Sequence, residues 1–173
     1  MMRIVAAALC LLGCQARAAQ PEKPVREPFI ALERDFQGFE RWPKIDLSNR
    51  PQHSETHAAG DAHEFVNRMP PSGSSTFPVG TILVKSVSQG AREQDIFAMV
   101  KRGAGYNSQG SPGWEWFELR RRPDETVGIV WRGVNPPNGE GYSGDPMGGC
   151  NGCHQMATKN DYVLAEALTL AKL

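Results

Sequence analysis

Four stretches in the middle of the chain carry the residue pattern of β-strands. Each is rich in β-branched and aromatic residues and is bounded by Gly, Pro, Asn or Asp. The four predicted strands cover residues 79–87, 95–102, 114–121 and 127–132. Turn signals between them favour antiparallel pairing. The pattern therefore predicts a mainly β fold built on an antiparallel sheet.

Three other stretches have the spacing of amphipathic helices. Residues 29–42 and 61–69 predict short helices that flank the sheet. Residues 162–173 predict a C-terminal helix, with Asn160 or Asp161 as its N-cap. The predicted class is thus α+β but mainly β, with short flanking helices and a C-terminal helix.

The N-terminus resembles an export signal. Arg3 precedes an apolar run over residues 4–13, which is too short to span a bilayer. Leu11–Cys14 (LLGC) resembles a bacterial lipobox, which predicts cleavage before Cys14 and lipidation of that cysteine. The alternative is ordinary signal-peptidase cleavage after Ala18. Either cleavage would leave the mature protein outside the cytoplasm.

Length and charge limit the organisation of the rest of the chain. With 173 residues, we expect a signal peptide over 1–13 (or 1–18), a tether and N-terminal segment over 14–50, and one domain over 51–173. Lys plus Arg and Asp plus Glu number 19 each, and no basic stripe is present. Nucleic acid is therefore not an expected partner.

The most specific motif is Cys150-Asn151-Gly152-Cys153-His154. A C-x-x-C-H run is the attachment signature of a c-type haem: both thiols bond the haem, and the histidine ligates its iron from the proximal side. A zinc site would need a second ligand pair, but the other cysteines, Cys10 and Cys14, lie at the far N-terminus. A thioredoxin-like motif would follow a strand, whereas a Gly/Pro-rich loop comes before this one. We therefore expect one covalently attached haem c.

The export signal and the haem motif agree on compartment, because bacteria attach haem to c-type cytochromes outside the cytoplasm. The expected location is the periplasm. The protein would be anchored to the outer membrane by lipidated Cys14, or soluble in the periplasm if ordinary signal peptidase cleaves it.

The position of the motif argues against an ordinary electron-transfer cytochrome c. Only nineteen residues follow His154, and Met156 is too close to reach the other haem face. The helical-bundle cytochromes c′ carry a late motif but need four long helices, whereas the middle of this chain has a β pattern. A late haem motif on a sheet defines a much narrower class.

Six sequence pieces, taken in order and spacing, resemble the cytochrome P-460 family, which also includes the cytochromes c′-beta. The resemblance runs from about His57 to Ala167, and only the haem motif is specific by itself. The pieces are residues 63–67 (HEFVN), 77–85 (FPVGTILVK), 97–102 (FAMVKR), 113–117 (GWEWF), 150–154 (CNGCH) and 160–163 (NDYV).

This resemblance implies a β fold, often dimeric, with one haem c, a proximal histidine and an open distal position. In the P-460 branch a lysine is cross-linked to the haem, and the protein oxidises hydroxylamine and nitric oxide. The c′-beta branch lacks the cross-link and binds small gases in an apolar pocket.

Lys85 matches the cross-linking lysine. Strand alternation places it on the same face as Val79, Leu83 and Val87. The alternatives for Lys85 are a path to solvent or a pair with a haem propionate.

A distal carboxylate would accept protons during hydroxylamine oxidation. Asp145, shortly before the haem motif, is the best-placed candidate, with Glu118 and Glu140 as the others. Each is also explained by an ordinary solvated charge. Further side chains considered as a sixth iron ligand are His53, His57, His63, Met69, Met99 and Met147. The aromatic residues considered as sheet core or haem lining are Phe77, Phe97, Trp114, Trp116, Phe117 and Trp131.

Three functions follow from these expectations. The first is an oxidoreductase acting on hydroxylamine or nitric oxide and passing electrons to another cytochrome, with an acid near the open iron face. The second is a non-catalytic protein that binds nitric oxide or carbon monoxide in an apolar pocket. The third is an electron-transfer cytochrome with a sixth ligand, which the late motif disfavours.

Overall fold

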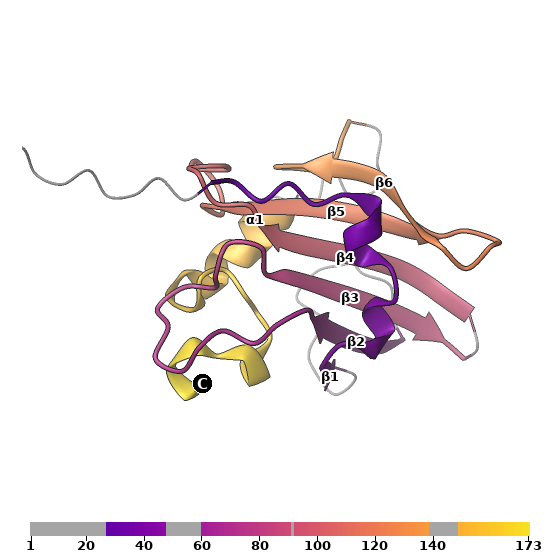
Figure 1. Ribbon diagram of the computed structural model, residues 1–173, viewed down its shortest axis with the longest axis horizontal. Coiled ribbons are helices and arrows are strands. Elements are labelled where there is room, and N and C mark those ends of the chain that lie inside the picture. Colours follow the sequence, from indigo (N-terminus) through magenta and orange to yellow (C-terminus); the bar gives the residue numbers. More distant parts are fainter. Residues whose placement is uncertain (1–26, 48–59, 91, 139–148) are drawn as a thin grey trace, which may run out of the picture.

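The chain folds around a six-stranded antiparallel sheet (Figure 1). The computed structural model describes residues 27–47, 60–90, 92–138 and 149–173. Each strand pairs with its neighbours in the chain, so the sheet order is β1-β2-β3-β4-β5-β6. The strands are β1 (Lys44–Asp46), β2 (Asp61–Val66), β3 (Ile82–Gln89), β4 (Arg92–Lys101), β5 (Trp114–Arg121) and β6 (Val127–Gly133). The predicted mainly β, antiparallel class is confirmed.

The helices are all short. They are the 3-10 helices η1 (Glu33–Phe36) and η2 (Phe39–Arg41), the α-helix α1 (Gly149–His154), and the 3-10 helices η3 (Gln155–Asn160), η4 (Glu166–Leu168) and η5 (Leu170–Lys172). Among the described residues, no helix is long and apolar enough to cross a membrane.

Three expected helices differ from the structure. Residues 61–69 do not form a helix; they contain β2, which pairs with both β1 and β3. Residues 29–42 form two 3-10 helices in place of one continuous helix, separated by Gly38 in a left-handed conformation. The C-terminal helix expected over 162–173 is replaced by η4 and η5.

The two faces of the sheet are covered by opposite ends of the described chain. The N-terminal face packs against the segment that contains η1 and η2, and its cluster includes Phe36, Phe39, Phe65, Val84 and Phe117. The C-terminal face packs against the segment after α1, and its cluster includes Leu83, Met99, Trp114, Trp116, Trp131 and Leu168. Cys150 of the haem motif packs against the C-terminal face. This face therefore positions the candidate site.

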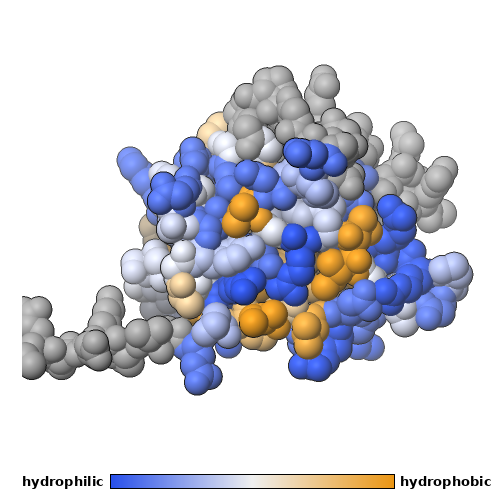
Figure 2. Space-filling model, turned by 90° about the horizontal axis from the view of Figure 1, so that it is seen from above, coloured by the Kyte–Doolittle hydropathy of each residue, from blue (hydrophilic) through white to orange (hydrophobic). Residues whose placement is uncertain are grey.

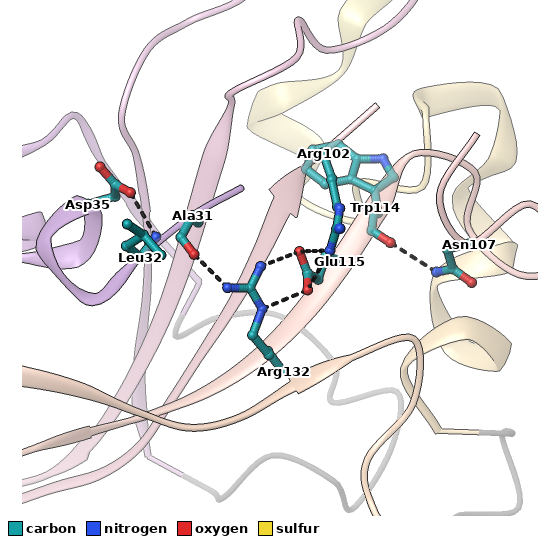
Figure 3. A network of polar contacts seen from close by, with 8 residues as sticks. All are labelled: Ala31, Leu32, Asp35, Arg102, Asn107, Trp114, Glu115 and Arg132. Atoms are coloured by element: carbon teal, nitrogen blue, oxygen red, sulfur yellow. Dashed lines mark hydrogen bonds and ion pairs between the residues drawn. The ribbon is translucent and has the colours of Figure 1, made fainter. Parts of the chain in front are cut away.

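A buried carboxylate ties the N-terminal segment to the sheet (Figure 3). Arg132 donates two hydrogen bonds of 2.7 Å to the Glu115 carboxylate, and Arg102 donates to both Glu115 oxygens at 3.2 Å. Arg132 also donates to the carbonyl of Ala31 at 2.6 Å. Because Glu115 is only 2% exposed, its charge depends on these two guanidinium groups.

The face of the molecule seen from above is mostly hydrophilic (Figure 2). Figure 2 shows that apolar residues form only small groups on the face seen from above. The exposed large apolar side chains are Ile30, Leu32, Met69, Val130, Val134 and Met156. Isolated apolar side chains of this kind are ordinary on protein surfaces.

Candidate haem site

The haem motif forms α1, a single short helical segment. It begins at Gly149, whose φ of +64° is a left-handed conformation that favours glycine. Cys150 and Cys153 are three residues apart on this segment, so their side chains lie on the same side of it. Neither is in a disulfide, and both are partly exposed. Two adjacent reduced thiols are what covalent haem attachment requires.

The ring of His154 is held by a hydrogen bond that determines its tautomer. Its Nδ1 lies 2.7 Å from the carbonyl oxygen of Tyr162. Because a carbonyl can only accept, Nδ1 carries the proton and Nε2 keeps its lone pair. A histidine whose Nδ1–H is bonded to a backbone carbonyl and whose Nε2 is free is typical of a metal ligand.

The Tyr162 carbonyl is aimed at His154 by an unusual backbone. Asp161 and Tyr162 both have left-handed conformations, with φ of 50° and 69°. Such a conformation costs about 1–2 kcal/mol per non-glycine residue. Side-chain and backbone contacts offset this cost. The Asp161 carboxylate accepts hydrogen bonds from the Phe77 amide (2.8 Å) and Lys101 Nζ (2.6 Å), and its carbonyl accepts one from Trp114 Nε1 (2.7 Å).

The other neighbour of His154 is Trp116, on β5. Their ring centroids are 4.5 Å apart with an interplanar angle of 47°. Loss of hydration lowers the pKa of His154 to about 4, although the hydrogen bond that His154 donates to the Tyr162 carbonyl opposes this shift; the charge of Lys85 lowers the pKa further. The imidazole is therefore neutral at neutral pH, which is the form that ligates iron.

Lys85 projects from the same face of the sheet as the haem motif. It alternates with Leu83, which belongs to the cluster of the C-terminal face. Cross-strand pairing puts Lys85 in one row across five strands, which comprises Glu64, Lys85, Phe97, Glu118 and Trp131. Burial lowers the pKa of the Lys85 ammonium, while Glu64 and Cys153 oppose this shift. The electrostatic interactions with Cys153 and His154 link Lys85 to the haem motif.

Glu118 is the described distal-acid candidate, and it belongs to this row. It is partly buried, and its Oε2 accepts a hydrogen bond of 3.0 Å from Trp131 Nε1. Arg120 approaches its other oxygen at 3.9 Å. The indole donor holds the carboxyl group on the C-terminal side of the sheet. The preferred sequence candidate, Asp145, and the alternative Glu140 lie outside the described residues.

The structure places the other candidate iron ligands and haem-lining residues in different parts of the fold. His63 alternates with Glu64 and shares the N-terminal face with Phe65, so it lies on the wrong side of the sheet to ligate the iron. Met99 is buried in the cluster of the C-terminal face, whereas Met69 is exposed after β2. Phe77 packs edge-on against Trp114 within the core. Cys14, His53, His57, Met147, the signal peptide and residues 14–26 of the tether lie outside the described residues.

The donor set fits a c-type haem. A covalently bound haem requires thiols for the thioether bonds, a nitrogen ligand for the iron and an apolar surface for the ring. Here they are two cysteines outside any disulfide, a histidine whose Nε2 keeps its lone pair, and a largely apolar sheet face. Within the described ranges, no three His, Cys, Asp or Glu side chains cluster as a metal site would require. A structural zinc site built on this C-x-x-C pair therefore finds no further ligands there.

Several residues of the site carried no sequence signal for this role. Trp116 is one of six aromatic residues expected as sheet core or haem lining, and the sequence does not indicate its contact with His154. Tyr162 supplies a backbone carbonyl, which any residue type can do. Glu64 was treated as part of a helix and lies opposite Lys85 on the neighbouring strand. Only the strand register could have revealed this last pairing.

In comparisons with known proteins, no family model, no curated protein and no solved structure matches this chain. The resemblance to the cytochrome P-460 family therefore stays a prediction from the residues themselves.

Proposed function

We propose that this protein is a mono-haem c-type protein of the cytochrome P-460 kind. Cys150 and Cys153 would hold the haem through thioether bonds, and His154 would ligate its iron on the proximal side. The observation that carries the proposal is the hydrogen bond from His154 Nδ1 to the Tyr162 carbonyl, because it leaves the Nε2 lone pair for a metal, next to two cysteines that form no disulfide.

We propose oxidation of hydroxylamine or nitric oxide as the reaction. A haem c held there would supply an iron that binds a small nitrogen oxide and takes up electrons. Asp145 remains the proton acceptor proposed from the sequence, and Glu118 is the candidate among the described residues, because it is an acid on the face that carries the haem motif. Electrons would then pass to another cytochrome.

Lys85 is the candidate for a cross-link to the haem. Its position on the C-terminal face and its lowered pKa support this role, since a neutral amine is the nucleophilic form of lysine. Without a cross-link, the same side chain would pair with a haem propionate.

Binding of nitric oxide or carbon monoxide without turnover is the second candidate function. It is favoured by the apolar character of much of the same face, where Leu83, Met99 and Trp116 are almost fully buried. The two functions differ in the role of Lys85 and Glu118, because only the enzyme would use these charged side chains in its reaction.

We propose that the protein acts in the periplasm, anchored to the outer membrane by lipidated Cys14 or soluble there. This proposal rests on the N-terminal sequence alone. A homodimer is proposed on the family resemblance.

The test is the absorption spectrum of the mature protein after export in a host with haem-attachment machinery. It is paired with the intact mass of the protein and of Lys85→Ala. A red-shifted ferrous Soret band that returns to the ordinary position in Lys85→Ala supports the cross-link and the enzyme. An ordinary high-spin spectrum, unchanged by the substitution, favours gas binding. A low-spin spectrum indicates an electron carrier, and the absence of haem overturns the proposal.

A further inference from the structure

Asn151, the first variable residue of the haem motif, makes an unusually complete set of hydrogen bonds. Its Oδ1 accepts from Asn107 Nδ2 (2.8 Å), the Ser111 amide (3.1 Å) and Trp116 Nε1 (2.9 Å). Its Nδ2 donates to the Val134 carbonyl (2.8 Å) and Asn107 Oδ1 (3.1 Å), with Asn135 Oδ1 at 3.5 Å. One side chain therefore joins α1 to β5 and to two loops.

The chemistry of the partners fixes the orientation of this amide. The Trp116 indole and the Ser111 amide can only donate, so they require the oxygen of Asn151. The Val134 carbonyl can only accept, so it requires the nitrogen. An aspartate would keep the first set of bonds and lose the second.

The loop that precedes β5 is shaped around Asn151. A Cβ atom on Gly110 would lie 2.3 Å from Asn151 Nδ2 and 2.6 Å from Asn107 Oδ1, well inside contact distance. Asn107 itself has a left-handed φ of 54°, and it also donates from Nδ2 to the Trp114 carbonyl at 3.1 Å. The loop thus needs a glycine at position 110 to admit the side chain.

The hydrogen bond from Trp116 links this anchor to the candidate iron ligand. Its indole nitrogen is held by Asn151, and its ring lies 4.5 Å from the ring of His154. The same side chain that fixes α1 therefore also fixes the aromatic surface against which His154 rests. His154 is also held by its hydrogen bond to the Tyr162 carbonyl.

We infer that Asn151 is a positioning residue for His154: it acts through Trp116 and α1 to hold the imidazole in one orientation toward the haem iron. This inference rests on the proposed function, since it assigns a role to Asn151 at the same site. Groups that orient a metal ligand without touching the metal commonly change metal affinity or activity about 10- to 100-fold when they are removed.

The experiment compares resonance Raman spectra of the ferrous, haem-loaded full chain, in which the iron–histidine stretching band reports the orientation of the imidazole. We expect Asn151→Ala to shift and broaden this band. Asn151→Asp, which keeps the acceptor for Trp116, should restore a narrow band close to the original. Gly110→Ala should reproduce the effect of Asn151→Ala without altering the motif.

Asn67→Ala is the matched control. Asn67 is also partly buried and bridges the backbone, from its Nδ2 to the Gly80 carbonyl and from the Ile82 amide to its Oδ1, both at 2.9 Å. Its loss should lower the melting temperature and leave the iron–histidine band unchanged. If a variant acquires too little haem for Raman spectroscopy, we measure the rate of hydrogen exchange of its backbone amides in residues 149–154. Faster exchange than in Asn67→Ala supports the inference.

Two results would overturn the inference, and they are distinct from each other. If the unsubstituted protein carries no haem, the proposed function fails and the inference fails with it. If the unsubstituted protein carries haem while Asn151→Ala gives the same narrow band and amide exchange as Asn67→Ala, only the inference fails.

Discussion

Lys101 and Asp161 form a buried ion pair that joins β4 to the segment following the haem motif. Lys101 Nζ lies 2.6 Å from Asp161 Oδ1, and both side chains are about as buried as the apolar core around them. The ammonium also lies 4.9 Å from the ring centroid of Trp114 and donates to the Pro112 carbonyl at 3.1 Å. Because Asp161 precedes Tyr162, this pair also supports the carbonyl that holds His154.

The first prediction concerns this pair. Asp161→Asn leaves the Lys101 ammonium buried without its counter-charge, which we expect to lower the free energy of unfolding by about 3–5 kcal/mol. Adding Lys101→Met to Asp161→Asn should recover part of the loss, since no charge is then buried. Denaturant unfolding measures both. Glu166→Gln, which breaks the exposed pair with Lys172 at 3.2 Å, should change the free energy by less than about 1 kcal/mol. Equal effects of Asp161→Asn and Glu166→Gln would contradict the prediction.

The second prediction concerns the buried carboxylate of Glu115. Glu115→Gln removes the charge shared by Arg102 and Arg132 and weakens the contact of Arg132 with the Ala31 carbonyl. We expect a loss of about 3 kcal/mol in the free energy of unfolding and faster proteolysis within residues 27–47. Limited proteolysis with mass spectrometry locates the cuts.

Glu166→Gln is the control for that experiment, because Glu166 lies outside the N-terminal segment and its carboxylate pairs with Lys172 at the surface. Its proteolysis pattern should match that of the unsubstituted protein. If Glu115→Gln is cleaved no faster within residues 27–47 than Glu166→Gln, the Glu115 carboxylate does not hold the N-terminal segment.

The third prediction is a pH dependence at Tyr106, whose ring lies 4.4 Å from the Arg102 guanidinium. Burial and the nearby Glu115 charge raise the pKa of this phenol above its usual 10.0, against the opposing charges of Arg102 and Arg132. The folded state therefore holds its proton more tightly than the unfolded state, so stability is retained below pH 10 and lost as pH rises through the raised pKa.

Tyr106→Phe should remove this part of the alkaline destabilisation. The test compares denaturant midpoints of the two proteins from pH 8 to pH 11. The difference between them should stay constant up to about pH 10 and then shift in favour of Tyr106→Phe. A difference that does not change with pH means that the phenol titrates alike in both states.

The fourth prediction concerns the proposed proton acceptor. Glu118→Gln should retain haem and the hydrogen bond with Trp131, since an amide oxygen also accepts. It should lower the rate constant for hydroxylamine oxidation by about 10²- to 10⁴-fold, the usual contribution of a general base. Stopped-flow turnover measures the rate, and the Soret spectrum checks that the haem is intact. Glu125→Gln, in the exposed turn between β5 and β6, is the control and should oxidise hydroxylamine normally. An unaltered rate constant in Glu118→Gln would show that Glu118 is not the proton acceptor.

The central strands could be predicted from sequence because their apolar residues recur with the period of a strand. β2 could not, because it is covered on both faces: Phe65 packs against the N-terminal segment and Val66 packs into the C-terminal cluster. A strand buried on both sides loses the polar alternation that distinguishes it from a helix.

The prediction of a C-terminal helix over residues 162–173 was wrong for a different reason. Its buried residues, Val163, Leu168 and Leu170 among them, have spacings compatible with a helix. The side chain of Asn160 instead bonds the Val163 carbonyl (2.7 Å) and the Leu170 amide (2.8 Å), which removes backbone groups from a helical ladder.

The candidate site was predictable where its residues are adjacent in the chain. The spacing of the cysteines and the histidine between Cys150 and His154 is enough to predict covalent haem attachment. The contacts that support it, to Trp116 and Tyr162, depend on how distant segments meet in the fold, and residue order does not encode them.

The sequential order of the sheet has a consequence for biosynthesis. Every strand pairs with the one made just before it, and all six lie ahead of α1 in the chain. Because synthesis proceeds from the N-terminus, the ribosome makes all six described strands of the sheet before it makes the two thiols and their histidine. If haem is attached as we propose, the two thiols would reach the attachment machinery on a chain in which the six described strands have already been exported.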